Sequence, residues 1–170
     1  MRIIFLDVDG VLNNEETTDR YQGWIGIDPL LVDKLKEIYN ASNEKEETRI
    51  VITSSWRYEK IKKFALVDGS YDYLLGRLKD AGLEVIGCTD MDKQSGWYRG
   101  REINKWLEDN KDKNVSTFVI LDDEFFDFEI RNLLCNLVRI NSVLGIIQAD
   151  IDRALKILNG EEVEPVDSYS

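Results

Sequence analysis

The stretch RIIFLDVDG, residues 2–10, determines the fold of this chain. Its apolar run of strand length stops at Asp7 and is closed by Gly10, a pattern typical of a strand buried on both faces of a parallel sheet. Parallel strands are joined by helices that cover the two faces of the sheet. The stretch therefore predicts an α/β chain with two carboxylates, Asp7 and Asp9, where the first strand ends.

The same alternation of strand and helix patterns continues to the end of the chain. Further apolar runs of strand length occupy residues 50–52, 83–86, 117–121 and 137–140. Helical spacing of apolar residues occurs at 31–39, 71–78, 103–107 and 151–158. Asp28 and Pro29 predict the start of the first helix, and the polar residues 40–48 predict a surface loop after it. We therefore expect a three-layer, Rossmann-like parallel sheet of about five strands with helices on both faces.

Length and charge limit the classes of partner. The chain has 170 residues, which predicts a single domain over residues 1–160 and a disordered acidic tail over residues 161–170. The formal net charge of −11 disfavours an extended nucleic-acid groove, because such grooves depend on Lys and Arg. A local site for one phosphate, such as a phosphate at a nucleic-acid end, stays compatible with this charge.

Histidine is absent, and this limits the chemistry. Without it, Ser/His/Asp and Cys/His nucleophile systems and the usual zinc sites are excluded. Cys88 and Cys135 are too far apart in the sequence for a CxxC site. We found no leader pattern and no apolar stretch long enough to cross a membrane, so we expect a cytoplasmic protein whose chemistry depends on carboxylates.

Residues able to bind a metal or a phosphate stand at the strand ends and at the start of one helix. They are Asp7, Asp9, Thr53, Ser54, Arg99, Arg101, Asp122 and Asp123. In a doubly wound sheet the carboxyl ends of the strands meet at one edge. Several carboxylates there would repel one another unless a divalent cation lay among them, and oxygen ligands favour Mg²⁺. Hydroxyls and an arginine beside such a cation are suited to a phosphoryl group.

Four segments carry a resemblance to a known superfamily. They are DVDGVLN (7–13), IVITSSWR (50–57), a basic residue that opens a helix, and ILDD (120–123). In this order they resemble the four motifs of the haloacid dehalogenase superfamily of aspartate-nucleophile phosphatases. RGREINKWL (99–107) and LVRINSVLG (137–145) are similar to the small phosphatase-like domains of that superfamily in phages and RNA-repair proteins.

The resemblance implies roles for the carboxylates. Asp7 would be the nucleophile that forms an aspartyl-phosphate, and Asp9 would protonate the leaving oxygen and then activate water. Asp7, the backbone carbonyl of Asp9, and Asp122 or Asp123 would hold Mg²⁺. The implied activity is Mg²⁺-dependent phosphomonoester hydrolysis.

The resemblance leaves two assignments open on the phosphate side. Either Thr53 or Ser54 fits the hydroxyl that binds a phosphate oxygen. Arg99 aligns best with the basic residue that would neutralise the phosphorylated aspartate. Arg101 and Lys105 lie about one helical turn further on and are alternatives.

The spacing between motifs also indicates the kind of substrate that the site can accept. The gap after the first strand is too short for a separate folded cap, so we expect an open site with a minimal cap or none. An open site suits a phosphate on a nucleic-acid end, a nucleotide or another bulky molecule. The loops 13–27 and 88–98, with Trp24 and Trp97, are candidates for its walls. The alternative functions are a phospho-receiver-like signalling domain and a non-catalytic module that binds phosphate or a partner.

Several of these residues also have ordinary structural explanations. Asp122 and Asp123 fit a helix cap before Glu124. Trp56 and Trp106 fit core positions. Asn13 and Asn141, near strand ends, fit either a turn or a contact that orients a carboxylate.

Overall fold

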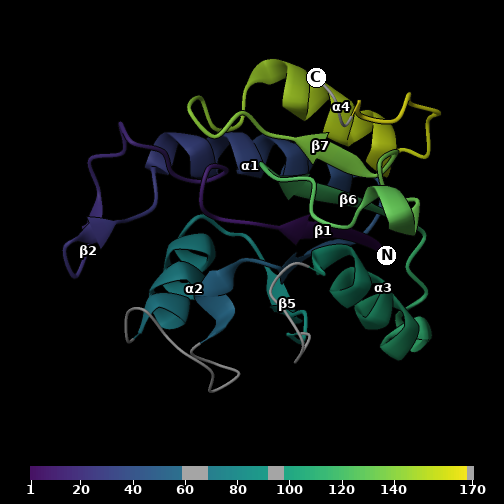
Figure 1. The fold of residues 1–170 in the computed structure, drawn as a ribbon, viewed down its shortest axis with the longest axis horizontal. Helices are drawn as coiled ribbons and strands as arrows, with labels where there is room; N and C mark the ends of the chain where they lie inside the picture. Colours follow the sequence, from purple (N-terminus) through teal and green to yellow (C-terminus); the bar gives the residue numbers. More distant parts are fainter. Residues whose placement is uncertain (59–68, 92–97, 168–170) are drawn as a thin grey trace.

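The computed structural model describes residues 1–58, 69–91 and 98–167, so Trp97, a candidate wall of the site, lies outside the described residues. Within these ranges five strands form one parallel sheet in the order β5-β4-β1-β6-β7 (Figure 1). Their bounds are Arg2–Leu6 for β1, Thr48–Ile52 for β4, Val85–Cys88 for β5, Thr117–Asp122 for β6 and Leu137–Arg139 for β7. The Rossmann-like architecture predicted from the sequence is confirmed.

Helices cover both faces of this sheet. Their bounds are Pro29–Asn43 for α1, Ser70–Asp80 for α2, Arg99–Asp109 for α3 and Gln148–Leu158 for α4, with short 3₁₀ turns at Ser55–Tyr58, Lys111–Lys113 and Glu129–Arg131. On β1, Ile4 and Leu6 belong to the apolar cluster shared with α1, α2 and α4. Ile3 and Phe5 belong to the cluster shared with α3. The alternation of side chains along β1 therefore separates two apolar layers.

Several predicted boundaries were wrong, including the start of β4, which begins at Thr48 and not at residue 50. The loop expected from residue 40 begins later, because α1 continues to Asn43. Its last turn is buried at Ser42, whose hydroxyl lies 2.8 Å from the hydroxyl of Thr48. Strand β5 begins and ends two residues later than predicted. Its pairing with β4 shifts register after Ile50 and brings Cys88 opposite Ile52, which extends the strand beyond Ile86.

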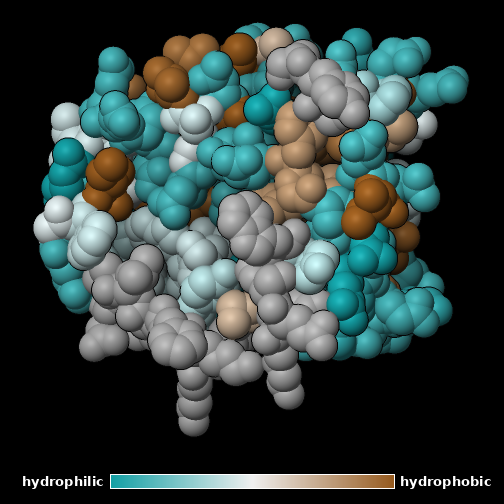
Figure 2. Space-filling model, viewed as in Figure 1, coloured by the Kyte–Doolittle hydropathy of each residue, from teal (hydrophilic) through white to brown (hydrophobic). Residues whose placement is uncertain are grey.

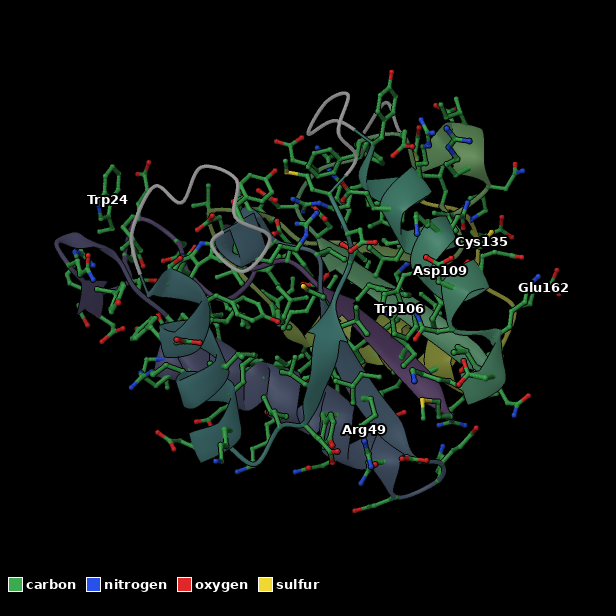
Figure 3. All side chains as sticks on the ribbon, turned by 90° about the horizontal axis from the view of Figure 1, so that it is seen from below. Trp24, Arg49, Trp106, Asp109, Cys135 and Glu162 are labelled. Atoms are coloured by element: carbon green, nitrogen blue, oxygen red, sulfur yellow. The ribbon has the colours of Figure 1, made fainter. Side chains whose placement is uncertain are left out.

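A small β-hairpin follows β1 where the sequence predicted a loop. It pairs β2 (Arg20–Tyr21) with β3 (Trp24–Ile25) through a turn in which Gln22 and Gly23 have positive φ angles of 49° and 89°. The hairpin projects from the body of the molecule, and the side chain of Trp24 lies at its outer end (Figures 1 and 3). Trp24 is 61% exposed.

The acidic segment 161–167 has no helix or strand, but it makes contacts with the domain. Arg153 donates a hydrogen bond to the backbone oxygen of Glu164 at 2.8 Å. The backbone N–H of Val166 donates to the carbonyl of Leu134 at 3.3 Å. This part of the expected disordered tail is therefore in contact with α4 and with the segment before β7.

The surface shown in Figure 2 is mostly hydrophilic where the structure describes it, and its apolar residues form separate small groups. In the described parts of the chain, none of the helices combines the length and apolarity that a bilayer crossing needs.

Candidate active site

Three strands bring the first polar residues of the site together. Leu6 of β1 pairs with Ile52 of β4 and with Leu121 of β6, so the residues that follow these strands lie beside one another. The backbone N–H of Asp7 donates to the carbonyl of Leu121 at 3.0 Å, and that of Thr53 donates to the carbonyl of Leu6 at 2.9 Å. The chain leaves β1 toward β4 and later returns to β6 on its other side, so this edge is the topological switch point of the sheet.

Three carboxylates gather at this edge. Asp7, Asp122 and Asp123 each offer an oxygen, and these oxygens lie within 4.8 Å of one another. Asp7 and Asp122 are buried, and Asp123 is half-buried. A Cβ on Gly10, which has a φ of 74°, would lie 2.5 Å from Oδ2 of Asp123. Glycine at this position therefore allows the loop after β1 to approach the cluster closely.

Burial strengthens the repulsion within this cluster. It raises the pKa of Asp123 to about 6, and the charges of Asp7 and Glu124 act in the same direction. It also raises the pKa of Asp122, against the opposing effect of Arg99. An all-oxygen donor set with surplus negative charge fits a hard divalent cation such as Mg²⁺.

Arg99 supplies a positive charge to the cluster. Its Nη1 lies 3.0 Å from Oδ2 of Asp7 and 2.6 Å from Oδ2 of Asp122, and its guanidinium carbon lies 4.2 Å from the ring centre of Phe126. Burial alone would disfavour its charge, but the two carboxylates outweigh burial and raise the pKa of Arg99. Arg99 is therefore the basic residue of α3 that meets the acidic cluster.

The two alternatives to Arg99 lie elsewhere on α3. Lys105 is exposed and pairs with Asp109 and Asp90. Arg101 is also exposed, and its backbone N–H donates to Asp127 at 3.1 Å.

Asp127 fixes the start of α3 and was missed in the sequence. This buried carboxylate accepts hydrogen bonds from the backbone N–H of Gly100 at 2.6 Å and of Arg101, and Nε of Arg131 lies 3.2 Å away. It thereby satisfies free N–H groups at the helix start beside Arg99. Asp127 lies 27 residues after Gly100, so no local capping pattern could have indicated it.

Asp9 lies apart from the acidic cluster. Its Oδ1 accepts a hydrogen bond from Nδ2 of Asn13 at 3.0 Å, and Nε1 of Trp56 lies 3.1 Å from Oδ1 and 3.0 Å from Oδ2. Desolvation by the surrounding protein raises the pKa of Asp9, although the residue retains an exposed surface, and these hydrogen bonds act in the opposite direction.

Asn13 has both of the roles that its sequence position allowed. It contacts the Asp9 carboxylate, and it also accepts the N–H of Gly10 at 3.1 Å in the turn after β1. Asn141 has the turn role, since its Oδ1 accepts the N–H of Val143 at 3.0 Å. Trp106 is a core residue that packs edge-on against Phe5. Trp56 also packs against the core, but its contact with Asp9 was not predicted.

The two candidate hydroxyls are both buried and both follow β4, which ends at Ile52. Oγ of Ser54 accepts a hydrogen bond from the N–H of Trp56 at 3.3 Å. Oγ1 of Thr53 has no hydrogen-bond partner among the residues that the structure describes. A buried hydroxyl without a partner is costly, so Thr53 is the better candidate to bind an oxygen of a ligand.

Arg57 supports this loop from within the protein and was also missed. It is 1% exposed, and its Nη1 donates to the backbone oxygens of Thr53 and Ser54, the latter at 2.7 Å. Its Nε donates to the carbonyl of Thr89 at 3.0 Å, and its Nη2 lies 2.6 Å from Oε2 of Glu102. Arg57 therefore joins the ends of β4 and β5 to α3.

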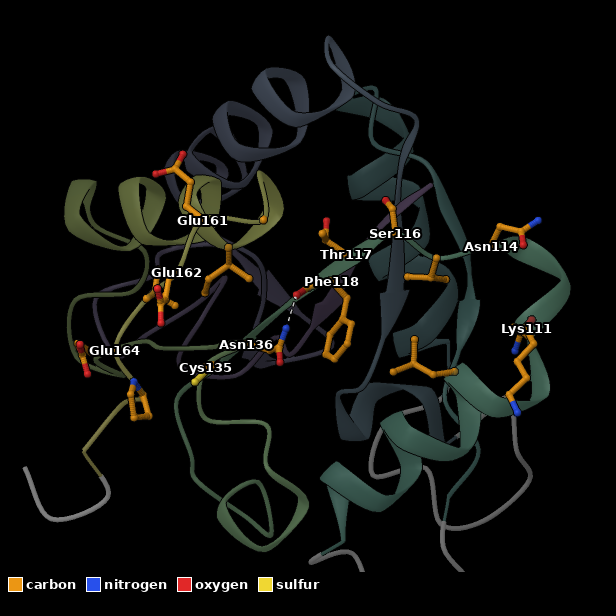
Figure 4. Close-up of a pocket in the computed structure, with 17 residues that line it drawn as sticks. Lys111, Asn114, Ser116, Thr117, Phe118, Cys135, Asn136, Glu161, Glu162 and Glu164 are labelled. Atoms are coloured by element: carbon orange, nitrogen blue, oxygen red, sulfur yellow. Dashed lines mark hydrogen bonds between the residues drawn. The ribbon is translucent and has the colours of Figure 1, made fainter.

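A pocket of about 840 Å³ lies at the opposite end of the sheet (Figure 4). It includes Thr117 and Phe118 at the start of β6, the end of α3 and the segment after α4. Asn136 at its wall donates to the carbonyl of Phe118 at 3.0 Å. The pocket and the acidic cluster are therefore separate features, at opposite ends of β6.

An acidic edge at the switch point of a Rossmann-like sheet is the arrangement expected from the motifs that resemble the haloacid dehalogenase (HAD) superfamily. A family model described as "HAD domain in Swiss Army Knife RNA repair proteins" matches residues 3–151, and the chain belongs to this family. This membership supports a phosphatase-like function in general. Neither the comparison with curated proteins nor that with solved structures gives a significant match.

Proposed function

We propose that residues 1–160 form a Mg²⁺-dependent phosphomonoester hydrolase that acts through an aspartyl-phosphate on Asp7. The observation that carries this proposal is the position of Asp7, 3.0 Å from Arg99 and in one cluster with Asp122 and Asp123. The carboxylate nucleophile thus has the positive charge of Arg99 beside it, and the acidic cluster offers oxygen ligands for a metal cation.

The residues that would hold Mg²⁺ are Asp7, Asp122 and Asp123, with the backbone carbonyl of Asp9. When bound, the ion would neutralise part of the phosphate charge and polarise the phosphoryl group. The closeness of the three carboxylate oxygens and the burial of Asp7 and Asp122 support this assignment.

Two aspartates share the covalent chemistry in this proposal. A carboxylate oxygen of Asp7 forms a bond to phosphorus while the ester P–O bond breaks, and Asp9 gives its proton to the leaving oxygen. A water oxygen then attacks phosphorus as Asp9 takes the water proton, which releases inorganic phosphate and restores Asp7. The separation of Asp9 from the acidic cluster supports this division of roles.

Arg99 and the hydroxyls after β4 would bind the remaining phosphate oxygens. Arg99 lies between Asp7 and Asp122, where negative charge would build up. The unpartnered Oγ1 favours Thr53 over Ser54 as the hydroxyl ligand. Arg101, exposed beyond Arg99, is the candidate for contact with more distant parts of the substrate.

We favour a phosphate at a nucleic-acid end as the substrate, with nucleotides as the closest alternative. The family description names RNA repair proteins, and the described segment between β1 and α1 holds a hairpin rather than a cap domain. The net charge of −11 favours contact with a strand end over contact along a strand.

The test is a panel of phosphate esters assayed with Mg²⁺ and with excess EDTA. The panel contains 5′- and 3′-phosphorylated oligonucleotides, nucleotides, sugar phosphates and phosphopeptides. Asp7→Asn should abolish turnover, with a loss of several orders of magnitude. Asp33→Asn, at an exposed position of α1, is the matched control and should leave turnover unchanged.

Two results would contradict the proposal. One is a tenth or more of wild-type turnover in Asp7→Asn, and the other is full activity in EDTA. Binding of phosphate without turnover of any ester would instead favour a non-catalytic module. Asp9→Asn should lower turnover roughly 10²- to 10⁴-fold, and less for esters with good leaving groups.

A further inference from the structure

We propose that Trp56 is a positioning residue for Asp9: its indole N–H holds the Asp9 carboxylate apart from the acidic cluster, in the orientation needed for proton transfer. This inference rests on the proposed function, in which Asp9 is the acid and base. Proton transfer requires the donor within hydrogen-bond reach of the leaving oxygen, so the orientation of this one side chain affects the rate.

The first argument is the geometry at the carboxylate. Nε1 of Trp56 lies 3.1 Å from Oδ1 and 3.0 Å from Oδ2 of Asp9, so one N–H faces both oxygens. Nδ2 of Asn13 donates to Oδ1 at 3.0 Å and to the carbonyl of Gly26 at 3.1 Å. Two donors from different segments therefore restrict rotation of the Asp9 side chain and leave Oδ2 the less engaged oxygen.

The second argument is that the Trp56 ring is itself fixed. Its backbone N–H donates to Oγ of Ser54, and its ring centre lies 6.1 Å from that of Tyr73 on α2. The Tyr73 ring in turn stacks on Tyr21 of the hairpin, with 4.5 Å between centres. The neighbouring residue, Arg57, is buried and joined to three elements. A ring that packs against the core and Tyr73, on a backbone fixed at Ser54 and Arg57, loses little entropy when it donates a hydrogen bond.

The third argument concerns what Asp9 would do without this contact. Asp9 is two residues from Asp7, yet among the residues that the structure describes, the oxygens within mutual reach for a cation belong to Asp7, Asp122 and Asp123. A freely rotating carboxylate beside a cation site could take up a fourth ligand position, where its oxygens would face the cation and not the substrate. The hydrogen bond from Trp56 opposes this rotation.

The kinetic test uses Trp56→Phe, which removes the N–H and keeps an aromatic ring. Misplacement of a catalytic group by about 1 Å can cost about 10²-fold in rate. We expect Trp56→Phe to lower turnover of alkyl phosphates about 10- to 100-fold and to affect aryl phosphates much less, because aryl leaving groups need little protonation. In an Asp9→Asn background the same change should have no further effect.

Trp106→Phe is the matched control, because Trp106 packs in the core against Phe5. It should leave the ratio of alkyl to aryl turnover unchanged. The proposal is wrong if Trp56→Phe lowers both ester classes equally, or if it multiplies the loss in Asp9→Asn by the factor seen in the wild type. Either result would mean that the ring acts through packing alone.

A second measurement does not depend on turnover. The chain has four tryptophans, so the indole N–H peak that disappears from the ¹⁵N spectrum of Trp56→Phe identifies Trp56. Asp9→Ala should move this peak, and Asp33→Asn should not. An unmoved peak would overturn the contact and the inference with it. A moved peak in a protein that hydrolyses none of the esters would leave the contact intact and overturn the proposed function.

Discussion

Removal of Glu102 is expected to destabilise the fold more than removal of any ordinary surface carboxylate, because it leaves Arg57 charged inside the protein. Arg57 is 1% exposed and Glu102 is 5% exposed, with 2.6 Å between Nη2 and Oε2. Burial lowers the pKa of Arg57, and the Glu102 carboxylate acts against this shift. The ion pair therefore keeps the guanidinium charged in a site that disfavours charge.

The structure also bounds the size of the effect. Breaking a buried pair from one side costs about 3–5 kcal/mol. The hydrogen bonds from Arg57 to backbone oxygens remain in Glu102→Ala, so we expect a loss near the lower end of that range. Glu102→Gln can still accept one hydrogen bond and should lose about 1.5–3 kcal/mol.

The assay is urea denaturation at pH 7, followed by circular dichroism and tryptophan fluorescence. Glu84→Gln is the control: Glu84 is 59% exposed and lies 3.1 Å from Arg49, and its loss should cost at most about 1 kcal/mol. Replacing both members of the buried pair, as in Arg57→Met with Glu102→Leu, leaves no uncompensated charge, but it also removes the donor to the backbone oxygens of Thr53, Ser54 and Thr89 and should destabilise at least as much as Glu102→Ala. The reasoning fails if Glu102→Ala costs no more than Glu84→Gln.

Three further predictions concern the metal, the start of α3 and the hairpin. Mg²⁺ at a hundredfold excess over its dissociation constant should stabilise the protein by about 2.7 kcal/mol. Thermal melts with Mg²⁺ and with EDTA measure this gain, and Asp122→Ala should remove it. An equal gain in the variant would count against the acidic cluster as the metal site. Asp127→Ala should lower the free energy of unfolding, measured in urea, by about 1–2 kcal/mol, and it should raise KM for the ester because Arg99 is held less firmly. Asp127→Asn should have intermediate effects. Unchanged stability and KM would contradict the capping role. The Tyr73 hydroxyl holds the pKa of Asp19 below its usual value, so this contact stabilises the fold at neutral pH and its contribution is lost as pH falls through the lowered pKa. Tyr73→Phe should therefore lower Tm at pH 7, and its difference from the wild type should narrow toward about pH 3; a difference that grows in acid would reverse the sign of the argument.

The sheet could be predicted from the sequence because buried parallel strands are continuous apolar runs with polar residues directly after them. The meeting of Asp7 with Asp122 follows from the same pattern, once β1 and β6 are neighbours. The end of α1 could not be predicted, because burial of Ser42 depends on Thr48 in the next strand. The hairpin was missed because its strands have two residues each, too few to show an alternating pattern.

The supporting residues of the site could not be found from local patterns. Arg57 reads in sequence as an ordinary charge near a strand end, and its burial depends on Glu102, which lies 45 residues later. The choice of Arg99 over Arg101 required knowing which side of α3 meets the sheet. For the hydroxyls, the sequence could not distinguish Thr53 from Ser54, because whether a partner is present depends on the fold around them.

The contacts of Asp122 and Asp127 with α3 limit the length of the chain between them. Asp122 pairs with Arg99 at 2.6 Å, and Asp127 accepts the N–H of Gly100, also at 2.6 Å. The last residue of β6 and a residue of the segment that follows it thus bind two consecutive residues of one helix. An insertion or deletion between them would force the loss of one contact, either the charge pair or the helix cap. For anyone who grafts new loops onto this scaffold, the number of residues from Asp122 to Asp127 is therefore as restricted as the identity of the two aspartates. The hairpin turn at Gln22 and Gly23 projects into solvent, so additional residues can be accommodated there.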